Sequence, residues 1–271
     1  EGNHGGDGGG GPGNGSVGMG ALVGGMAAVS INAGSGSGHA DGDGTKNDRG
    51  HVERPASNER YGITKDELMA LPVCHYPGQI FVIEAQEQEA PALALLDGET
   101  ILGFDTETKP AFIKGERNNT SVVQVASKKA CLIYCLDPDR GRAAIPPGLR
   151  ELIANPGIKL VGQGICNDIV KMHQEYGIIG KAIVNLEPLS EAVGVRTGSR
   201  NLRALTGIFM QSRLTKAQQM SNWAQRPLAN SQVMYAATDA WVGLRIHQVM
   251  EERHGKEGAW TSAYRPETIV K

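Results

Sequence analysis

The sequence ILGFDTETKP, at residues 101–110, joins a buried strand to two carboxylates. Leu102 and Phe104 predict a β-strand in the core, and Asp105 and Glu107 follow directly. Side chains alternate across a strand, so residues two apart share one face, and both carboxylates are expected to point the same way. A solvated strand end is the ordinary explanation of one Asp-x-Glu pattern. A site for a hard divalent cation is the alternative, because such ions prefer carboxylate oxygens.

Around this stretch the apolar pattern predicts strands first and then alternating strands and helices. Three successive strands indicate a β-meander, and the later alternation indicates an α/β layer fold with a mixed sheet. The expected strands cover residues 82–86, 101–105, 121–127, 130–136, 158–163 and 181–186. The expected helices cover residues 65–70, 86–98, 146–155, 165–177, 187–194, 201–210 and 230–253.

The 271 residues are expected to divide into one folded domain and three flanking segments. The first fifty positions hold 19 of the 37 glycines and scarcely any apolar periodicity, so residues 1–60 are expected to be a Gly-rich disordered tail. Residues 61–80 are expected to form an N-terminal arm, 81–255 the single domain and 256–271 a C-terminal extension. Residues 61–271 carry 23 basic and 22 acidic side chains, which excludes a global basic field. Any nucleic-acid binding must therefore use a local groove.

The four cysteines, Cys74, Cys131, Cys135 and Cys166, form no CxxC pair. Thiols in the core are the expected state, and they suit a reducing compartment, so we expect a cytoplasmic protein, with the nucleus and organelles left open. No run reaches the roughly 18–20 apolar residues of a membrane span. The chain begins with Glu1 and not with Met, which leaves open whether the native N-terminus is present.

A third carboxylate, Asp168, lies early in the expected helix 165–177. The apolar positions Ile165, Ile169 and Met172 mark the buried face of this helix, and Asp168 lies at the edge of that face. An acid stabilised by the helix dipole is the ordinary explanation, because the N-terminal turn favours negative charge. An inward-leaning carboxylate with a cationic partner is the alternative.

A fourth carboxylate, Asp239, lies on the apolar stripe of the last helix. The stripe steps by four, three, four and three residues through Tyr235, Asp239, Val242, Ile246 and Val249. A buried Asp that accepts a hydrogen bond from Tyr is one explanation. The other is that four carboxylates together form a two-metal site for phosphoryl transfer, with Tyr235 placed to orient or deprotonate the attacking water.

In order and spacing, these motifs resemble the DEDD superfamily of 3′–5′ exonucleases. GFDTET resembles the first motif, LVGQGICND the second, and YAATDAW the third, whose tyrosine marks the DEDDy branch. The segment KAQQMSNW resembles the region between the last two motifs in the ribonuclease D and Werner-exonuclease-like group. The resemblance covers about residues 80–252, most of the expected domain.

The resemblance implies a fold, a reaction and a set of site residues. The fold would be ribonuclease H-like, with a mixed five-stranded sheet whose first three strands are antiparallel, flanked by helices. Asp105, Glu107, Asp168 and Asp239 would hold two Mg²⁺ or Mn²⁺ ions, and Tyr235 would position the nucleophilic water. Domain 81–255 would hydrolyse the 3′-terminal phosphodiester of DNA or RNA, in a single strand or a recessed duplex, and release nucleoside monophosphates.

The sequence departs from the family pattern at three places. Gly164 stands where relatives often carry Asn, and Asn185 stands where many carry Asp, so Asn185 is not counted as a ligand. Ala229 stands where relatives usually offer Ser or Thr as a helix cap, and Asn230 is the alternative cap.

Several alternatives stay open. A non-catalytic nucleic-acid-binding module that kept the fold is the rival hypothesis, and a helicase or tRNA-processing subunit would need an additional helical domain, for which we expect no room after the last helix. Arg213 and Lys216 either contact phosphate or lie in a solvated turn, and Trp223 is expected to wedge the last helix rather than stack on a base. No motif reads the sugar 2′ position, so the sequence does not choose between DNA and RNA. It also leaves processivity, oligomeric state and the role of the tail open.

Overall fold

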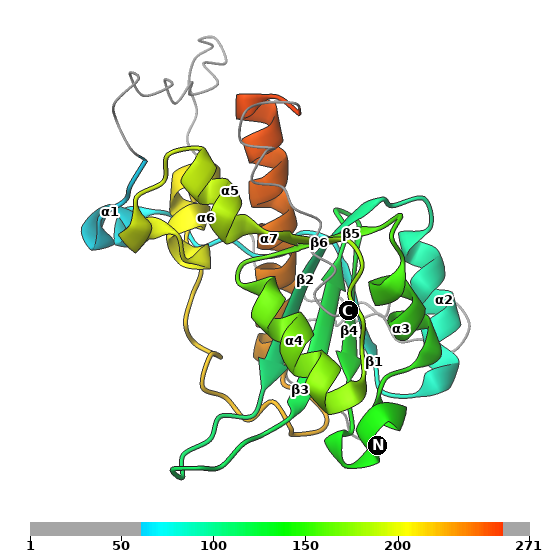
Figure 1. Ribbon diagram of the computed structural model, residues 1–271. Helices are drawn as coiled ribbons and strands as arrows, with labels where there is room; N and C mark the ends of the chain where they lie inside the picture. The colour runs from blue at the N-terminus through cyan, green and yellow to red at the C-terminus, as the bar shows by residue number, and fades with distance from the viewer. Residues whose placement is uncertain (1–60, 257–271) are drawn as a thin grey trace, which may run out of the picture.

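The structure of the chain is a computed structural model that describes residues 61–256 (Figure 1). The expected tail at 1–60 and nearly all of the expected C-terminal extension lie outside the described residues. No helix within 61–256 combines the length and the apolar character needed to cross a lipid bilayer.

One mixed sheet organises the domain, with the strand order β1-β4-β3-β2-β5-β6. Strands β2, β3 and β4 are antiparallel neighbours, as the meander predicted, whereas β5 and β6 extend the sheet in parallel beyond β2. The resemblance implied five strands, and the sixth is β1, which pairs in parallel with β4 at the other edge. The strands are β1 (Gln79–Ile83), β2 (Ile101–Thr108), β3 (Thr120–Ala126), β4 (Ala130–Cys135), β5 (Lys159–Gly162) and β6 (Ile183–Asn185).

Helices cover both faces of the sheet (Figure 1). Helix α7 packs on one face, where its small side chains meet β3 and β4, while α2, α3 and α4 cover the other face. Helices α1, α5 and α6 gather beside α7 at one end of the molecule (Figure 1). The helices are α1 (Lys65–Ala70), α2 (Glu89–Leu93), α3 (Pro147–Ala154), α4 (Ile165–Tyr176), α5 (Leu186–Ala192), α6 (Leu202–Met210) and α7 (Asn230–His254).

Gly103 allows α7 to lie directly on β2. A Cβ at this position would lie 2.0 Å from the carbonyl oxygen of Ala240, which no packing tolerates. Ala236, Ala237 and Ala240 are fully buried on the facing side of α7, so small side chains line the contact. The helix backbone therefore comes close to the strand one residue after Asp239.

The expected helix at 86–98 is broken in the structure. Only α2 is α-helical, and 3₁₀ turns at Gln86–Gln88 and Ala94–Leu96 flank it. Pro91 has no N–H with which to continue the hydrogen-bond ladder. The carboxylate of Glu89 is buried, and it is stabilised there by hydrogen bonds from the N–H groups of Gly148 and Leu149, at the start of α3.

The N-terminus of α7 has a cap different from the expected one. Ala229 occupies the capping position, and Asn230 is already the first helical residue, so the prediction that Asn230 caps the helix is wrong. The side chain of Gln232 takes over part of this role, because its Oε1 accepts from the N–H of Ala229 at 2.9 Å. Its Nε2 donates to Ser221 Oγ at 2.9 Å, which holds the preceding loop against the helix.

Candidate active site

Three carboxylates converge where β2 passes under α7. Asp105 and Glu107 point to the α7 face of the strand, and Asp239 meets them from the helix. One oxygen from each side chain lies within 4.8 Å of the others. Strand alternation explains why the first two share a face, and the contact at Gly103 explains why the helix brings the third so close.

Asp168, the fourth predicted carboxylate, lies in the first turn of α4, on the other side of β2. It is not a member of the group of three, but its charge raises the pKa of both Asp105 and Glu107, so it lies within electrostatic reach of them. Thr106 points to the opposite face from its two neighbours, and its Oγ1 donates a hydrogen bond of 2.7 Å to Asp168 Oδ1. Strand β2 therefore supplies two carboxylates to one side and orients the fourth on the other.

Burial and mutual repulsion raise the pKa values of the carboxylates in this cluster. Burial raises the pKa of Asp105 well above its usual range, and the charges of Asp168 and Asp239 add to the effect. The pKa of Glu107 rises to about 10 for the same reasons, with Asp105 as its strongest neighbour. Half-buried carboxylates with this much repulsion need a cation or protons between them. The residues present therefore fit a divalent metal site.

Asp239 is the least perturbed of the three clustered carboxylates. Burial raises its pKa to about 7, while hydrogen bonding with Tyr235 and the positive charge of Arg203 act in the opposite direction. Arg203 belongs to α6 and was not singled out by its position in the sequence. Only the packing of α6 beside α7 brings its guanidinium near the site.

Tyr235 lies one helical turn before Asp239 and contacts Trp223. The ring centroids of these two aromatic residues are 6.0 Å apart, and their planes are tilted by 46°. Trp223 is fully buried, which confirms that it wedges against α7 and leaves no face for stacking on a base. Burial, followed by the charges of the carboxylates, raises the pKa of Tyr235, so its hydroxyl stays protonated.

Two departures from the family pattern are linked in the structure. Gly164 adopts a left-handed conformation with φ of 74° just before α4. Its N–H donates to Asn185 Oδ1 at 3.0 Å, and the same oxygen accepts from the N–H of Glu187 at the start of α5. Asn185 therefore fixes the turn that precedes α4, which in turn places Asp168.

Lys171 is a further residue that the sequence did not indicate. Its Nζ donates to Thr108 Oγ1 at 2.9 Å and Thr120 Oγ1 at 3.0 Å, and it pairs with Glu175 at 3.0 Å. Its charge also lowers the pKa of Asp168, although burial of that carboxyl has the larger, opposite effect. The three-residue spacing from Asp168 on one helix was the only available signal.

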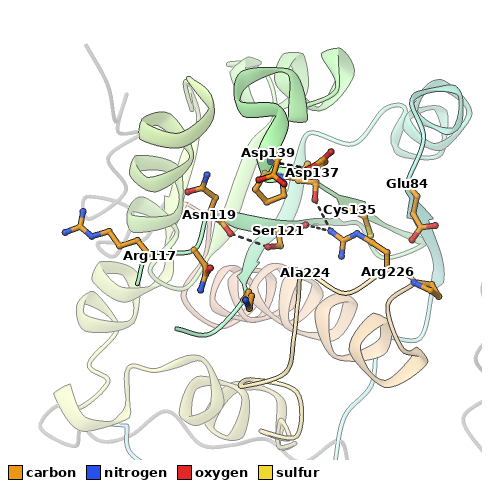
Figure 2. Close-up of a pocket in the computed structure, with 14 residues that line it drawn as sticks. Glu84, Arg117, Asn119, Ser121, Cys135, Asp137, Asp139, Ala224 and Arg226 are labelled. Carbon is orange, nitrogen blue, oxygen red and sulfur yellow. Dashed lines mark hydrogen bonds between the residues drawn. The ribbon is translucent and has the colours of Figure 1, made fainter. Parts of the chain in front are cut away.

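Three cavities lie near this end of the sheet. Two of them, of about 480 and about 170 Å³, are lined by both Tyr235 and Asp239. The third, of about 1040 Å³, lies beyond the end of β2, beside the loop at 224–227 (Figure 2). None of the five motif residues lines this larger cavity.

Comparison with known proteins identifies the sequence relatives. A family model described as 3′–5′ exonuclease matches residues 80–254. The bifunctional 3′–5′ exonuclease/ATP-dependent helicase WRN of Mus musculus is 30% identical over 205 residues, which cover 72% of this chain and 14% of the relative. A 3′–5′ exonuclease of Arabidopsis thaliana is 27% identical over 218 residues, covering 74% of this chain and 73% of the relative. The exonuclease mut-7 homolog of Homo sapiens is 30% identical, and this chain covers 20% of its length.

Solved structures share the fold. The EXO domain of Nibbler from Aedes aegypti superposes with a TM-score of 0.56 at 23% identity, covering 68% of this chain and 94% of that domain. NrnC of Brucella melitensis with bound Mg²⁺ superposes with a TM-score of 0.53 at 20% identity, covering 62% and 81%. The same protein has been solved bound to pGG. The fold is therefore the ribonuclease H-like fold of these nucleases.

Proposed function

Since this chain belongs to the 3′–5′ exonuclease family of the DEDD superfamily, we propose that it hydrolyses the 3′-terminal phosphodiester of a nucleic acid in a two-metal-dependent reaction that releases nucleoside monophosphates. The observation that carries the proposal is the convergence of Asp105, Glu107 and Asp239 within 4.8 Å of one another. The catalytic unit is one domain, residues 81–255.

Asp105, Glu107, Asp168 and Asp239 would hold two divalent ions, Mg²⁺ or Mn²⁺. Such ions supply Lewis-acid stabilisation of the charge that develops on the phosphoryl oxygens and make a bound water more acidic. The chain's own contribution is to hold four carboxylates in place before substrate arrives. Thr106 orients Asp168 by its 2.7 Å hydrogen bond, and Gly103 sets the distance between β2 and α7.

Tyr235 has the role of orienting the attacking water. Its raised pKa, for which burial is the main cause, keeps the phenol protonated, so it acts as a hydrogen-bonding group that fixes the water. The ring is held against Trp223, which restricts where the hydroxyl can point.

The substrate class is a 3′ end of DNA or RNA, in a single strand or a recessed duplex. The Brucella protein, which shares the fold, has been solved bound to pGG, which supports a nucleic-acid substrate. For the location we propose the cytoplasm, with the nucleus and organelles left open, because thiols in the core suit a reducing compartment.

The test is degradation of a 5′-labelled oligonucleotide by the wild-type chain and by Asp105→Ala and Asp239→Ala variants. We expect a ladder of shortened products with Mg²⁺ or Mn²⁺, none with EDTA, and at least about 10³-fold less hydrolysis by either variant. Lys181→Ala, an exposed position between α4 and β6, is the control and should match the wild type.

Undiminished hydrolysis by both aspartate variants would overturn the assignment. Metal-dependent binding of the oligonucleotide without release of nucleotide would instead identify a non-catalytic binding module. Parallel panels of DNA, RNA and recessed duplex would decide the preferred substrate.

A further inference from the structure

The cavity of about 480 Å³ beside Asp239 and Tyr235 has a basic lining. The basic residues of its walls come from three separate segments of the chain. The arm before β1 contributes Lys65, helix α6 contributes Arg203, and the loop after α6 contributes Lys216. Asp239 is the one acidic residue among the described residues that line it. The cavity is therefore continuous with the carboxylate cluster but opposite in charge.

The basic groups of this cavity are available to a ligand. Arg203 uses its Nε to donate to the carbonyl of Leu214 at 3.3 Å, and within residues 61–256 its terminal nitrogens make no hydrogen bond. Lys65 and Lys216 form no ion pair with any carboxylate in that same range. The half-buried guanidinium of Arg203 is thus held at Nε, and the residue lines the cavity.

The wall that carries Lys65 is firmly docked. Gly207 of α6 packs so closely against the arm that a Cβ there would lie 2.7 Å from Ile63 Cδ1 and 2.8 Å from Leu68 Cδ1. Farther along the arm, Arg213 Nε donates to the carbonyl of Leu71 at 2.9 Å. The arm is therefore part of the cavity and not a loose leader to the domain.

The larger cavity in Figure 2 differs from the cavity beside Asp239 in the net charge of its lining and in the hydrogen bonds of its basic side chains. Its lining contains three basic residues, Lys109, Arg117 and Arg226, and three acidic residues, Glu84, Asp137 and Asp139. Both terminal nitrogens of the Arg226 guanidinium donate hydrogen bonds to backbone carbonyls, including those of Ser121 at 2.9 Å and Leu136 at 3.0 Å. This cavity has little surplus positive charge, so it is not the better site for an anion.

Building on the proposed exonuclease function, we infer that the cavity lined by Lys65, Arg203 and Lys216 binds the backbone phosphate immediately 5′ of the scissile bond. In a strand with a free 3′ hydroxyl, the scissile phosphate is the last phosphate. Any further phosphate that reaches a neighbouring basic cavity must therefore belong to the nucleotides on the 5′ side. The strand enters over α6 and the arm, and its 3′ end crosses the carboxylate cluster.

The test compares two oligonucleotides that differ at one linkage. One carries ordinary phosphates throughout, and the other carries an uncharged methylphosphonate at the linkage next to the scissile bond. The wild-type chain should process the charged form with a roughly two- to five-fold higher kcat/KM, the size expected for one partly exposed charge pair. Arg203→Gln and Lys65→Gln should reduce or remove this preference, whereas Arg140→Gln, an exposed position away from the cavity, should keep it.

The preference between two substrates is the decisive quantity because Arg203 also acts on Asp239. Losing its charge changes metal binding, but that change affects both oligonucleotides equally and cancels in the ratio. Lys65 provides a second variant without that complication. In equilibrium binding, each variant should also lower the slope of log affinity against log salt by about 0.7.

Equal preference for the charged linkage in the wild type, Arg203→Gln and Lys65→Gln would overturn the inference. The equilibrium-binding measurement uses Ca²⁺ in place of Mg²⁺ and needs no hydrolysis. It therefore tests whether the phosphate subsite exists even if the chain releases no nucleotide. Absent hydrolysis with an intact charge preference in binding would reject the proposed reaction and keep the subsite. Hydrolysis without any preference between the two oligonucleotides would reject the phosphate subsite and keep the proposed reaction.

Discussion

Tyr235 places a protonated phenol one helical turn from Asp239. Removing this hydroxyl alone tests directly whether Tyr235 orients the attacking water. We expect Tyr235→Phe to lower kcat by about 10- to 100-fold, because the water loses a positioning hydrogen bond while four carboxylates remain. KM should change little, and the packing against Trp223 should persist because the ring is retained. Steady-state kinetics with Tyr61→Phe as the matched control measures this, and an unchanged kcat for Tyr235→Phe would refute the role.

At the scale of single residues, the sequence predicted the carboxylates that cluster but not the side chains that contact and orient them. Asp105 and Glu107 follow from strand alternation, and Asp239 from its place on an apolar stripe, because both arguments use only local periodicity. Thr106 and Arg203 could not be found that way. Their contacts depend on where α4 and α6 dock, and docking is set by packing between residues far apart in the chain.

The contact between β2 and α7 makes Gly103 the most sensitive position among the elements. Gly103→Ala would place a methyl group 2.0 Å from the carbonyl oxygen of Ala240, so α7 must move away and carry Asp239 with it. We expect the free energy of unfolding to fall by about 3 kcal/mol and metal affinity to weaken at least tenfold. Chemical denaturation and metal titration by calorimetry measure the two effects.

Gly198→Ala is the matched control, because a Cβ at that position meets no atom within 4 Å and its backbone is not left-handed. It should leave both stability and metal affinity unchanged. A Gly103→Ala variant as stable as this control would show that α7 does not rest on β2 as described.

The expected strands are all present in the described domain, whereas the helix expected at 86–98 is broken and several boundaries differ. Strand β2 runs to Thr108, past the expected end at 105, so Glu107 lies within the strand and not after it. The strand expected at 82–86 lies at Gln79–Ile83, because its parallel pairing pairs Gln79 with Ala130 and Ile83 with Tyr134. The apolar residues Ile80 and Phe81 precede the expected range, and the local pattern does not reveal which residues a partner strand will pair with. The helix expected at 86–98 is broken because Pro91 has no N–H with which to continue the hydrogen-bond ladder. The contact of buried Glu89 with the N-terminus of α3 could not be predicted either, because it depends on tertiary packing.

For the molecule as a whole, a sheet order that places β2 between β3 and β5 makes the site possible. The central strand is covered on one face by α7 and on the other by α4, so acids from both helices reach the same strand. The meander followed by alternation predicted this layering. It did not predict that the arm would close against α6 and form a cavity wall, because no local periodicity reports a docking partner.

A clustered acidic site is expected to make the stability of the whole domain depend on pH, and bound divalent cations should change that dependence. For an acid with a raised pKa in the folded state, the folded form binds more protons than the unfolded form, so stability falls as pH rises between the two pKa values. For Glu107 that window runs from 4.5 to about 10, and for Asp239 from 3.8 to about 7. Metal-free protein should therefore melt several degrees lower at about pH 8.5 than at about pH 7.

Divalent cations should reverse this loss, because they bind the folded state and replace the protons. The rise in melting temperature caused by Mg²⁺ or Mn²⁺ should be larger at about pH 8.5 than at about pH 7, since fewer protons compete for the carboxylates. Glu107→Gln should flatten the pH dependence of the metal-free protein and shrink the metal-induced rise. Differential scanning fluorimetry across this range is the measurement, and a metal-induced rise that is independent of pH would contradict a site built from these carboxylates.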